Sequence, residues 1–271
     1  MSNLSEKVSL PKERIPKPFS QNVYKDGRLF TTVNSCVTCS IVKVIEVLYA
    51  IKNGYYTELS KGYAYVKHSG KTENGTASEI VLESMLEKGI GTVPYDMCAD
   101  YTQKPEICNI IETRADLAEL DKEAEKWSIE SWERVKCNNS TELKESIIKH
   151  IRTHNTPIIG DVIGKNGLNH CVVITGCDDD YIYYHDHDKK GEECRAKYSK
   201  WKKSFYYISI SEGGNDMEFT DVKETDWFYE AVKTVCEKGI MEGVGADKFD
   251  PNKPLTRAEA ATIICRLINN K

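Results

Sequence analysis

The spacing of apolar residues changes from a helical period to a strand period about halfway along this chain of 271 residues. In the first half, apolar residues recur every three or four positions, which predicts amphipathic helices. The predicted helices cover residues 39–53, 77–88, 116–127 and 141–154. Short β-branched and aromatic runs separated by Gly, Asn and Asp then predict antiparallel strands at 157–163, 171–175, 181–184 and 205–211. Helices followed by strands indicate an α+β fold.

The composition excludes several classes of protein. Hydrophobic residues make up 40% of the chain and charged residues 29%, which is typical of a globular protein. The net charge of −5 disfavours nucleic-acid binding, which usually accompanies a basic excess. No run of about 18 apolar residues predicts a membrane span. The polar N-terminus also lacks the apolar core of a signal peptide, so we expect either a signal removed from the native protein or export by another route.

The cysteines are numerous but scattered. Of the ten, only Cys36 and Cys39 have the spacing of metal ligands, and no second pair completes a four-ligand zinc site. A chain of this length does not need disulfides to hold a small core together. We therefore expect mostly reduced, buried thiols, with one or two disulfides as the alternative, and we predict no metal and no cofactor.

A glycine-rich polar segment, Ser211-Glu-Gly-Gly-Asn-Asp, is the best linker in the chain. Beyond it the pattern returns to helix–loop–helix. The sequence therefore predicts two domains, residues 1–213 and residues 214–271.

Three residues of the first domain have the order and chemistry of a catalytic triad. Cys39 lies at the start of the first long helix, where the helix dipole and free backbone N–H groups favour a thiolate. His170 opens a strand 131 residues later, within the separation typical of papain-like enzymes, and Asp186 follows the next strand, where it is able to orient the imidazole. The alternative interpretation makes Cys39 and His170 ordinary buried core residues.

Several segments of this domain resemble the papain-like cysteine peptidases, in the order in which that family has them. They are Ser35–Ser40, Leu59-Ser60-x-x-Tyr63, Gly75-Thr-Ala-Ser with Pro94-Tyr95, Asn169–Asp178 and Tyr181–Asp186, and together the similarity spans roughly residues 15–210. The resemblance implies a helical half and an antiparallel β-sheet half. It also implies Cys39 as nucleophile, His170 as base and Asp186 as orienting residue.

Two positions depart from the family pattern. The family has an oxyanion-hole glutamine six residues before the nucleophile, where this chain has Val33. Loss of one oxyanion donor typically lowers the rate by about 10²–10³-fold, and Asn34 is the candidate replacement. The orienting residue is Asp rather than Asn, an exchange that the logic of the triad permits.

The C-terminal segment resembles one S-layer-homology (SLH) repeat nearly element by element. The matching stretches are Phe219–Val222, Trp227–Val232, Gly239–Gly243, Phe249–Asn252 and Leu255–Glu259. Periodicity predicts one helix over 226–238 with Trp227, Ala231 and Val235 inward, and a second, capped by Thr256, with an inward stripe of Ala260, Ile263, Ile264 and Leu267.

The SLH resemblance implies binding of an anionic secondary cell-wall polysaccharide. By position, Trp227, Gly243 and Arg257 match the ligand-facing residues, and Arg257 is suited to grip a carboxylate. The alternative is that these side chains only hold the helix pair together. Because the family usually assembles three repeats, a single repeat also predicts a homotrimer or packing against the catalytic domain.

Together these features predict a cysteine-type peptidase held at a bacterial cell wall and acting on protein or peptide. A phage-type endolysin that cuts peptidoglycan peptides is one rival, since it accounts for both the wall-binding module and the polar N-terminus. A catalytically degenerate peptidase fold that serves as a cell-surface binding or structural protein is the other, motivated by Val33.

Overall fold

The chain divides into two compact units. A computed structural model describes residues 7–14, 24–25, 28–29, 35–69, 75–99, 111–164, 167–186, 192–210, 219–223, 225–237, 240–241, 243–244 and 248–269. Unit 1 comprises Met1–Leu48 and Thr57–Ser211, and unit 2 comprises Tyr49–Tyr56 and Glu212–Lys271. Within the described segments, no helix is both long and apolar enough to cross a membrane.

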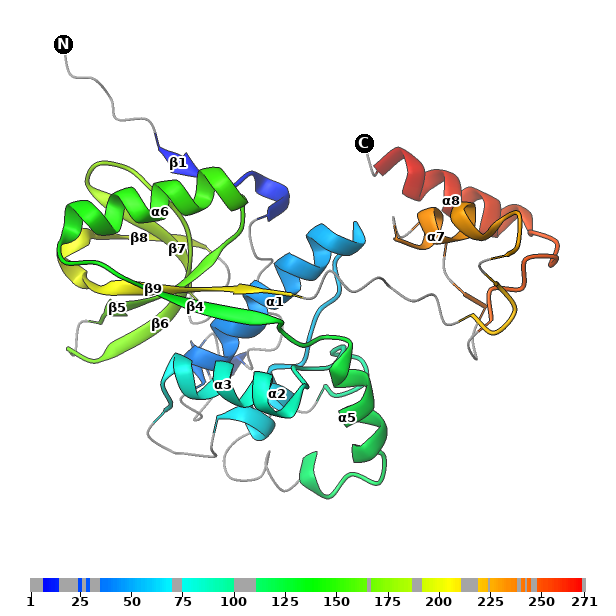
Figure 1. The fold of residues 1–271 in the computed structure, drawn as a ribbon, viewed down its shortest axis with the longest axis horizontal. Coiled ribbons are helices and arrows are strands. Elements are labelled where there is room, and N and C mark those ends of the chain that lie inside the picture. The colour runs from blue at the N-terminus through cyan, green and yellow to red at the C-terminus, as the bar shows by residue number, and fades with distance from the viewer. Residues whose placement is uncertain are drawn as a thin grey trace, which may run out of the picture. The chain divides into compact units, whose positions relative to one another are not determined.

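Helix α1 (Cys36–Asn53) is the central element of unit 1. Every residue from Val37 to Tyr49 is buried, as expected for a helix that is apolar on nearly all faces. Figure 1 shows the other helices of the first half grouped to one side of α1 and the sheet to the other. The N-terminus of α1 therefore lies within unit 1, close to both halves.

The helical half contains α2 (Lys61–His68), α3 (Ser78–Lys88) and α5 (Leu117–Glu125). The Ser60 hydroxyl caps α2 by accepting the Tyr63 N–H at 3.1 Å. Gly89, at φ 67°, ends α3 in the left-handed conformation that glycine adopts without strain. The core of this half is Tyr63, Tyr65, Val66, Val93, Cys98, Ile111, Leu120 and Ala124.

The second half is a seven-stranded sheet covered by α6 (Ser140–His154). The strands are β1 (Val8–Ser9), β4 (Ser131–Lys136), β5 (Ile158–Ile163), β6 (Asn169–Cys177), β7 (Tyr181–His185), β8 (Glu193–Lys197) and β9 (Trp201–Ser209). Their order is β4-β9-β5-β6-β7-β8, with β1 paired to β6. Each strand is antiparallel to the strands beside it in this order, and β1 is antiparallel to β6. Ile147 and Ile151 of α6 pack on Ile158, Val172 and Phe205 of the sheet.

Short elements complete the described part of unit 1. They are the two-stranded pairing of β2 (Tyr24–Lys25) with β3 (Arg28–Leu29), and the 3₁₀ turns η1 (Lys12–Arg14) and η3 (Tyr198–Lys200).

The predicted α+β class is confirmed, and the predicted helices and strands of unit 1 all form. Besides the short elements β1, β2, β3, η1 and η3, the elements α2, β4 and β8 were not predicted. Helix α2 has only eight residues, with a glycine and two tyrosines among them, so it forms through its cap and its burial rather than through helix propensity. Strand β4 lies at the edge of the sheet, and strands β4 and β8 expose most of their residues, so neither carries a buried apolar run.

Unit 2 contains two helices, α7 (Tyr229–Glu237) and α8 (Arg257–Asn269). The loop before α8 folds back on the start of the unit, because Asp221 accepts the N–H groups of Phe249 and Asp250 at 2.9 and 2.8 Å. The rings of Phe219 and Phe249 lie 5.5 Å apart. These contacts fix the position of the loop that joins the two helices.

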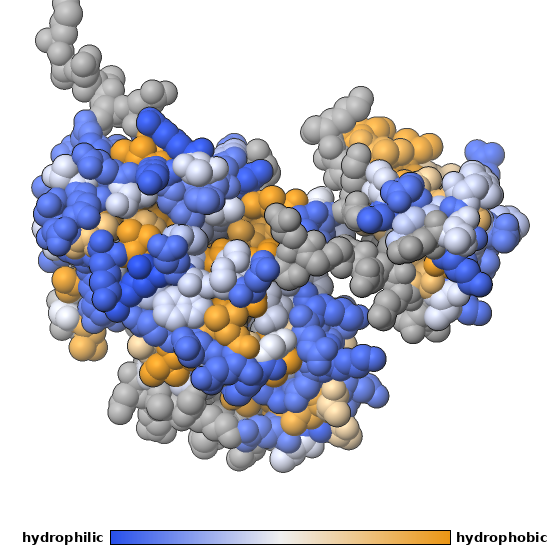
Figure 2. Space-filling view, in the orientation of Figure 1, coloured by the Kyte–Doolittle hydropathy of each residue, from blue (hydrophilic) through white to orange (hydrophobic). Residues whose placement is uncertain are grey.

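Two predictions about unit 2 were wrong. Trp227 precedes α7 rather than belonging to it, and it is 93% exposed instead of inward. Ala231 is also exposed, while its neighbour Val232 is buried. On α8, Ile264 and Leu267 are exposed at 56% and 47%, because one helix pair is too small to cover the full apolar stripe. Figure 2 shows hydrophobic side chains at the surface of this helix.

A buried ion pair stabilises the middle of α1. Lys43 Nζ lies 2.6 Å from Glu46 Oε2, and both side chains are at most 1% exposed. The other oxygen of Glu46 accepts the Leu59 N–H at 2.8 Å, which ties α1 to the segment that begins α2. Removing one member of such a pair leaves an uncompensated buried charge.

We predict that Lys43→Met lowers the free energy of unfolding by about 3 kcal/mol or more, because Glu46 loses its ion-pair partner. The matched control is Lys126→Met, since Lys126 is 64% exposed and pairs with Glu123 at the surface. That substitution should change stability by about 1 kcal/mol at most. Urea denaturation followed by circular dichroism measures both, and equal losses for the two variants would contradict the prediction.

Candidate active site

Cys36 is the first residue of α1, and its side chain is partly exposed. The residue before it, Ser35, is buried and its carbonyl accepts the Cys39 N–H at 2.8 Å, the first hydrogen bond of the helix. The first N–H groups of a helix have no partner within the helix and carry its positive dipole end. The Cys36 sulfur therefore lies at the positive end of the α1 dipole.

His170 and Asp186 lie on neighbouring strands. His170 is the second residue of β6, and Asp186 directly follows β7. Because Val173 pairs with His185, Asp186 comes to the level of Val172, two residues from His170. The His170 Nε2 and the Asp186 Oδ1 are 2.8 Å apart, and the two side chains are 24% and 8% exposed. The structure thus brings together two of the three predicted triad residues.

The third group beside His170 is the Cys36 thiol. Burial alone lowers the pKa of His170, but hydrogen bonds to Asp186 and to Cys36 outweigh burial and raise that pKa to about 10. Since Nε2 contacts Asp186, the nitrogen that faces Cys36 is Nδ1. One turn further along α1, the Ser40 hydroxyl donates to the Cys171 carbonyl at 3.1 Å. This contact holds the Cys36 face of α1 against the strand residue that follows His170.

Two other histidines of unit 1 show the opposite behaviour. His68 is bonded to Ser84 and to the Gly91 carbonyl, and burial lowers its pKa to about 4. Burial, with the charge of His154, lowers the pKa of His150 to about 4 as well. Both are neutral at physiological pH, whereas His170 keeps its proton.

The nucleophile predicted from the sequence, Cys39, lies elsewhere. It is fully buried one turn into α1, and its Sγ lies 3.4 Å from the Ser35 Oγ. A substrate carbonyl has no access to a sulfur with no exposed surface. The geometry therefore favours Cys36, three residues earlier, which sequence reasoning missed. The spacing allowed both residues, since Cys36 precedes His170 by 134 residues and Cys39 by 131, both within the family range.

The oxyanion donor predicted from the sequence, Asn34, lies outside the described residues, as does Val33. Counted from Cys36, the position six residues earlier is Phe30, which is not glutamine either and is also outside the described residues. The first turn of α1 supplies backbone N–H donors beside the Cys36 sulfur.

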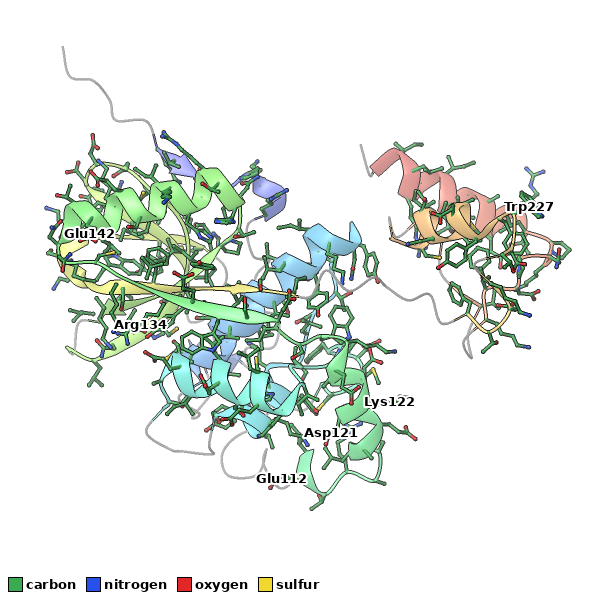
Figure 3. All side chains as sticks on the ribbon, in the orientation of Figure 1. Glu112, Asp121, Lys122, Arg134, Glu142 and Trp227 are labelled. Carbon is green, nitrogen blue, oxygen red and sulfur yellow. The ribbon has the colours of Figure 1, made fainter. Side chains whose placement is uncertain are left out.

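The predicted polymer-binding residues belong to unit 2. Trp227 is labelled in Figure 3 on the surface of this unit, and Arg257 is the exposed first residue of α8. Gly243 has a packing reason instead, because a Cβ there would lie 2.6 Å from the Phe219 ring and 2.8 Å from the Lys248 carbonyl oxygen. Among the residues that the structure describes, no group of three or more His, Cys, Asp or Glu side chains is arranged to hold a metal ion.

Comparison with known proteins identifies the smaller unit. The S-layer homology domain model matches residues 218–261. The chain carries an S-layer homology domain. The surface-layer 125 kDa protein of Lysinibacillus sphaericus is 51% identical over 53 residues, which are 20% of this chain and 4% of that protein. The S-layer protein sap of Bacillus anthracis is 39% identical over 51 residues, 19% of this chain and 6% of that protein. The similarity thus spans only a small part of these relatives.

Solved structures similar to this one identify the larger unit. A cysteine protease of Carica candamarcensis, in complex with E-64, has a TM-score of 0.51 at 15% identity and covers 74% of this chain and 95% of its own. The ragweed pollen allergen Amb a 11, a cysteine protease in its proform, has a TM-score of 0.53 at 16% identity and covers 78% and 68%. The larger unit has a papain-like fold, with the predicted helical half and sheet half.

We predict that His170 titrates near pH 10 and that its pKa falls in both Asp186→Ala and Cys36→Ala, because each change removes a hydrogen bond that favours the imidazolium. Cys39→Ser is the matched control and should leave the His170 pKa unchanged. NMR titration of the imidazole signals measures this, with His68 and His150 near 4 as internal references. A His170 pKa that responds to Cys39→Ser but not to Cys36→Ala would return the nucleophile to Cys39.

Proposed function

We propose that this protein is a cysteine-type peptidase that hydrolyses peptide bonds through Cys36, His170 and Asp186, held at a bacterial cell surface by its S-layer homology domain. The observation that supports the catalytic part most directly is the 2.8 Å contact of His170 Nε2 with Asp186 Oδ1, with Cys36, the first residue of α1, hydrogen-bonded to the same imidazole. A protonated imidazole beside a thiol at a helix N-terminus is the arrangement of an activated cysteine nucleophile. Cys36 takes the role of nucleophile that the sequence suggested for Cys39.

The mechanism follows from these positions. The Cys36 sulfur attacks the peptide carbonyl carbon, and the N–H groups at the start of α1 stabilise the charge that develops on the carbonyl oxygen. The C–N bond breaks as His170 Nδ1 gives its proton to the leaving amine, which leaves a thioester on Cys36. His170 then takes a proton from water, whose oxygen attacks the thioester and releases the acid. Asp186 holds the imidazole in place through Nε2 and stabilises its positive charge.

One feature of the site bears on the rival functions. The pairing of His170 with Asp186 at 2.8 Å favours a working site over a retired one, since a degenerate site has no need to keep the imidazole charged. A general peptidase and an enzyme that cuts peptidoglycan peptides both act on peptide bonds, and this proposed triad suits either. Parallel assays on casein and on purified cell walls distinguish the two substrates.

We predict that a papain-type epoxide inhibitor alkylates Cys36 selectively among the ten cysteines, because Cys36 is the thiol that shares a hydrogen bond with His170. Peptide mass mapping locates the label. Cys36→Ala should abolish labelling and lower kcat/KM by about 10⁴-fold or more, and His170→Ala should slow both. Cys39→Ala is the control and should keep most of both. Uniform labelling of exposed thiols, with no turnover of casein or cell walls, would leave a non-catalytic protein.

The S-layer homology domain supports attachment to the cell wall. The matched residues 218–261 include Trp227 and Arg257, and both side chains are exposed. Gly243 differs from them, because close packing against Phe219 and Lys248 requires a glycine there. A guanidinium group forms paired hydrogen bonds to a carboxylate, and an exposed indole ring packs on a sugar face. The proposed ligand is therefore an anionic secondary cell-wall polysaccharide.

A homotrimer through this domain is part of the proposal. The apolar residues Leu255, Ile264, Leu267 and Ile268 at and near α8 are exposed by 47–66%. Exposed apolar side chains grouped along one helix are typical of a surface that packs against another repeat. Light scattering that gives the mass of a single chain at working concentration would remove the trimer from the proposal.

We predict that Arg257→Ala weakens binding to purified Gram-positive cell walls by about tenfold or more, because a charge-assisted hydrogen-bond pair is lost. Sedimentation with the walls, followed by quantification of the free protein, measures the affinity. Lys253→Ala removes a nearby exposed charge and is the control, for which we expect little change. Equal losses for the two variants would point to a general charge effect rather than a specific carboxylate contact.

A further inference from the structure

The mechanism above uses Cys36 and leaves the second cysteine of the first turn of α1 unexplained. Cys36 and Cys39 are three residues apart at the N-terminus of the helix. The first is partly exposed and contacts His170, and the second has no exposed surface. An accessible, activated thiol followed by a sheltered one is the arrangement of a redox-sensing cysteine with its resolving partner.

The geometry of the first helical turn allows the two sulfurs to join. Residues three apart on a helix have Cβ atoms about 5–6 Å from each other. A disulfide needs a Cβ separation of about 3.5–4.5 Å, so a small tightening of the turn is sufficient. The regular hydrogen bonds of α1 begin with the bond from the Cys39 N–H to the Ser35 carbonyl oxygen. This bond lies within the same turn as the two cysteines.

The surroundings of Cys39 also support chemistry at its sulfur. The Ser35 hydroxyl, at 3.4 Å, is placed to donate to a thiolate. Lys61 is fully buried, and burial lowers the pKa of its amine. The largest opposing effect on that pKa comes from the nearby Cys39. Cys177 is a contrasting case, because burial raises the pKa of its thiol and it lies in the sheet core.

We propose that Cys36 and Cys39 are a reversible oxidation site, in which a peroxide oxidises Cys36 and Cys39 closes an intrahelical disulfide that a dithiol reopens. The disulfide does not depend on the proposed peptidase activity. Only the consequence, a reversible loss of that activity with protection of Cys36 from irreversible oxidation, rests on the proposed function.

The oxidation balances with hydrogen peroxide as the only co-reactant. The Cys36 thiolate attacks one peroxide oxygen, the O–O bond breaks, and the departing hydroxide takes the His170 proton to become water. The sulfur has then lost two electrons and is a sulfenic acid. Cys39 attacks that sulfur, the S–S bond forms as the S–O bond breaks, and the hydroxyl leaves as water with the Cys39 proton. Two thiols and one peroxide give one disulfide and two waters, and a dithiol such as dithiothreitol returns two electrons.

The test uses the full chain, reduced, desalted and exposed to hydrogen peroxide. Trypsin cleavage after Arg28 and Lys43 places both cysteines in the peptide Leu29–Lys43. We expect this peptide to become lighter by two hydrogen atoms and to stop reacting with N-ethylmaleimide, both reversed by dithiothreitol. In Cys39→Ser, Cys36 should instead progress to sulfinic or sulfonic acid. Dithiothreitol should then restore less than about a tenth of the N-ethylmaleimide-reactive thiol that it restores in wild type. Cys177→Ser is the matched control and should behave as wild type.

Two outcomes would overturn the proposal. One is a wild-type Leu29–Lys43 peptide that keeps two alkylatable thiols after peroxide treatment. The other is over-oxidation of Cys36 at the same rate in wild type and Cys39→Ser. Because the readout is the mass of a peptide, a chain without peptidase activity still gives a decisive answer, and failure of the proposed function remains distinguishable from failure of the disulfide.

Discussion

The burial of α1 is the constraint on which the catalytic arrangement depends. From Val37 to Tyr49 the helix is enclosed, so its axis and its rotation are set by packing on nearly every side. Ser40 bonds to the carbonyl of Cys171 in β6, and Glu46 bonds to the N–H of Leu59 before α2. The helix that carries Cys36 is therefore tied to both halves of unit 1. The same contacts that join the halves present Cys36 to His170, so stability and catalytic geometry have a common origin.

His170 and Asp186 lie together as the sequence led us to expect, because strand pairing leaves little freedom. Two short strands joined by a tight turn place the start of one beside the end of the next, and both residue types suit their roles. The nucleophile was harder, because Cys36 and Cys39 both lie in the first turn of the same helix and their separations from His170 differ by three residues. Motif and spacing do not resolve such a shift. Burial does, since Cys39 is enclosed while Cys36 is partly exposed.

Much of the fold follows from apolar periodicity, and the misses show where that signal ends. Helix α6 and strands β5 and β6 carry buried apolar residues at regular spacing, so all three were predictable. Strand β4 forms because β9 offers it hydrogen bonds, although its own residues are mostly charged and exposed. In α8 the stripe is real but Ile264 and Leu267 remain exposed. Periodicity identifies the apolar face of a helix, and only the surrounding structure determines what covers it.

The charge on Asp186 connects the catalytic and redox properties of Cys36. A neutral orienting side chain holds an imidazole by hydrogen bonding alone, whereas a carboxylate also stabilises its positive charge. With Asp186 on one side and Cys36 on the other, His170 remains protonated until the pH rises through about 10. The Cys36 sulfur then faces an imidazolium across the neutral range, in the proposed attack on peptide carbonyls and on peroxides alike. In the proposed scheme Cys36 is the thiol that a peroxide oxidises, and the buried Cys39 thiol three residues along the helix closes the disulfide that protects it.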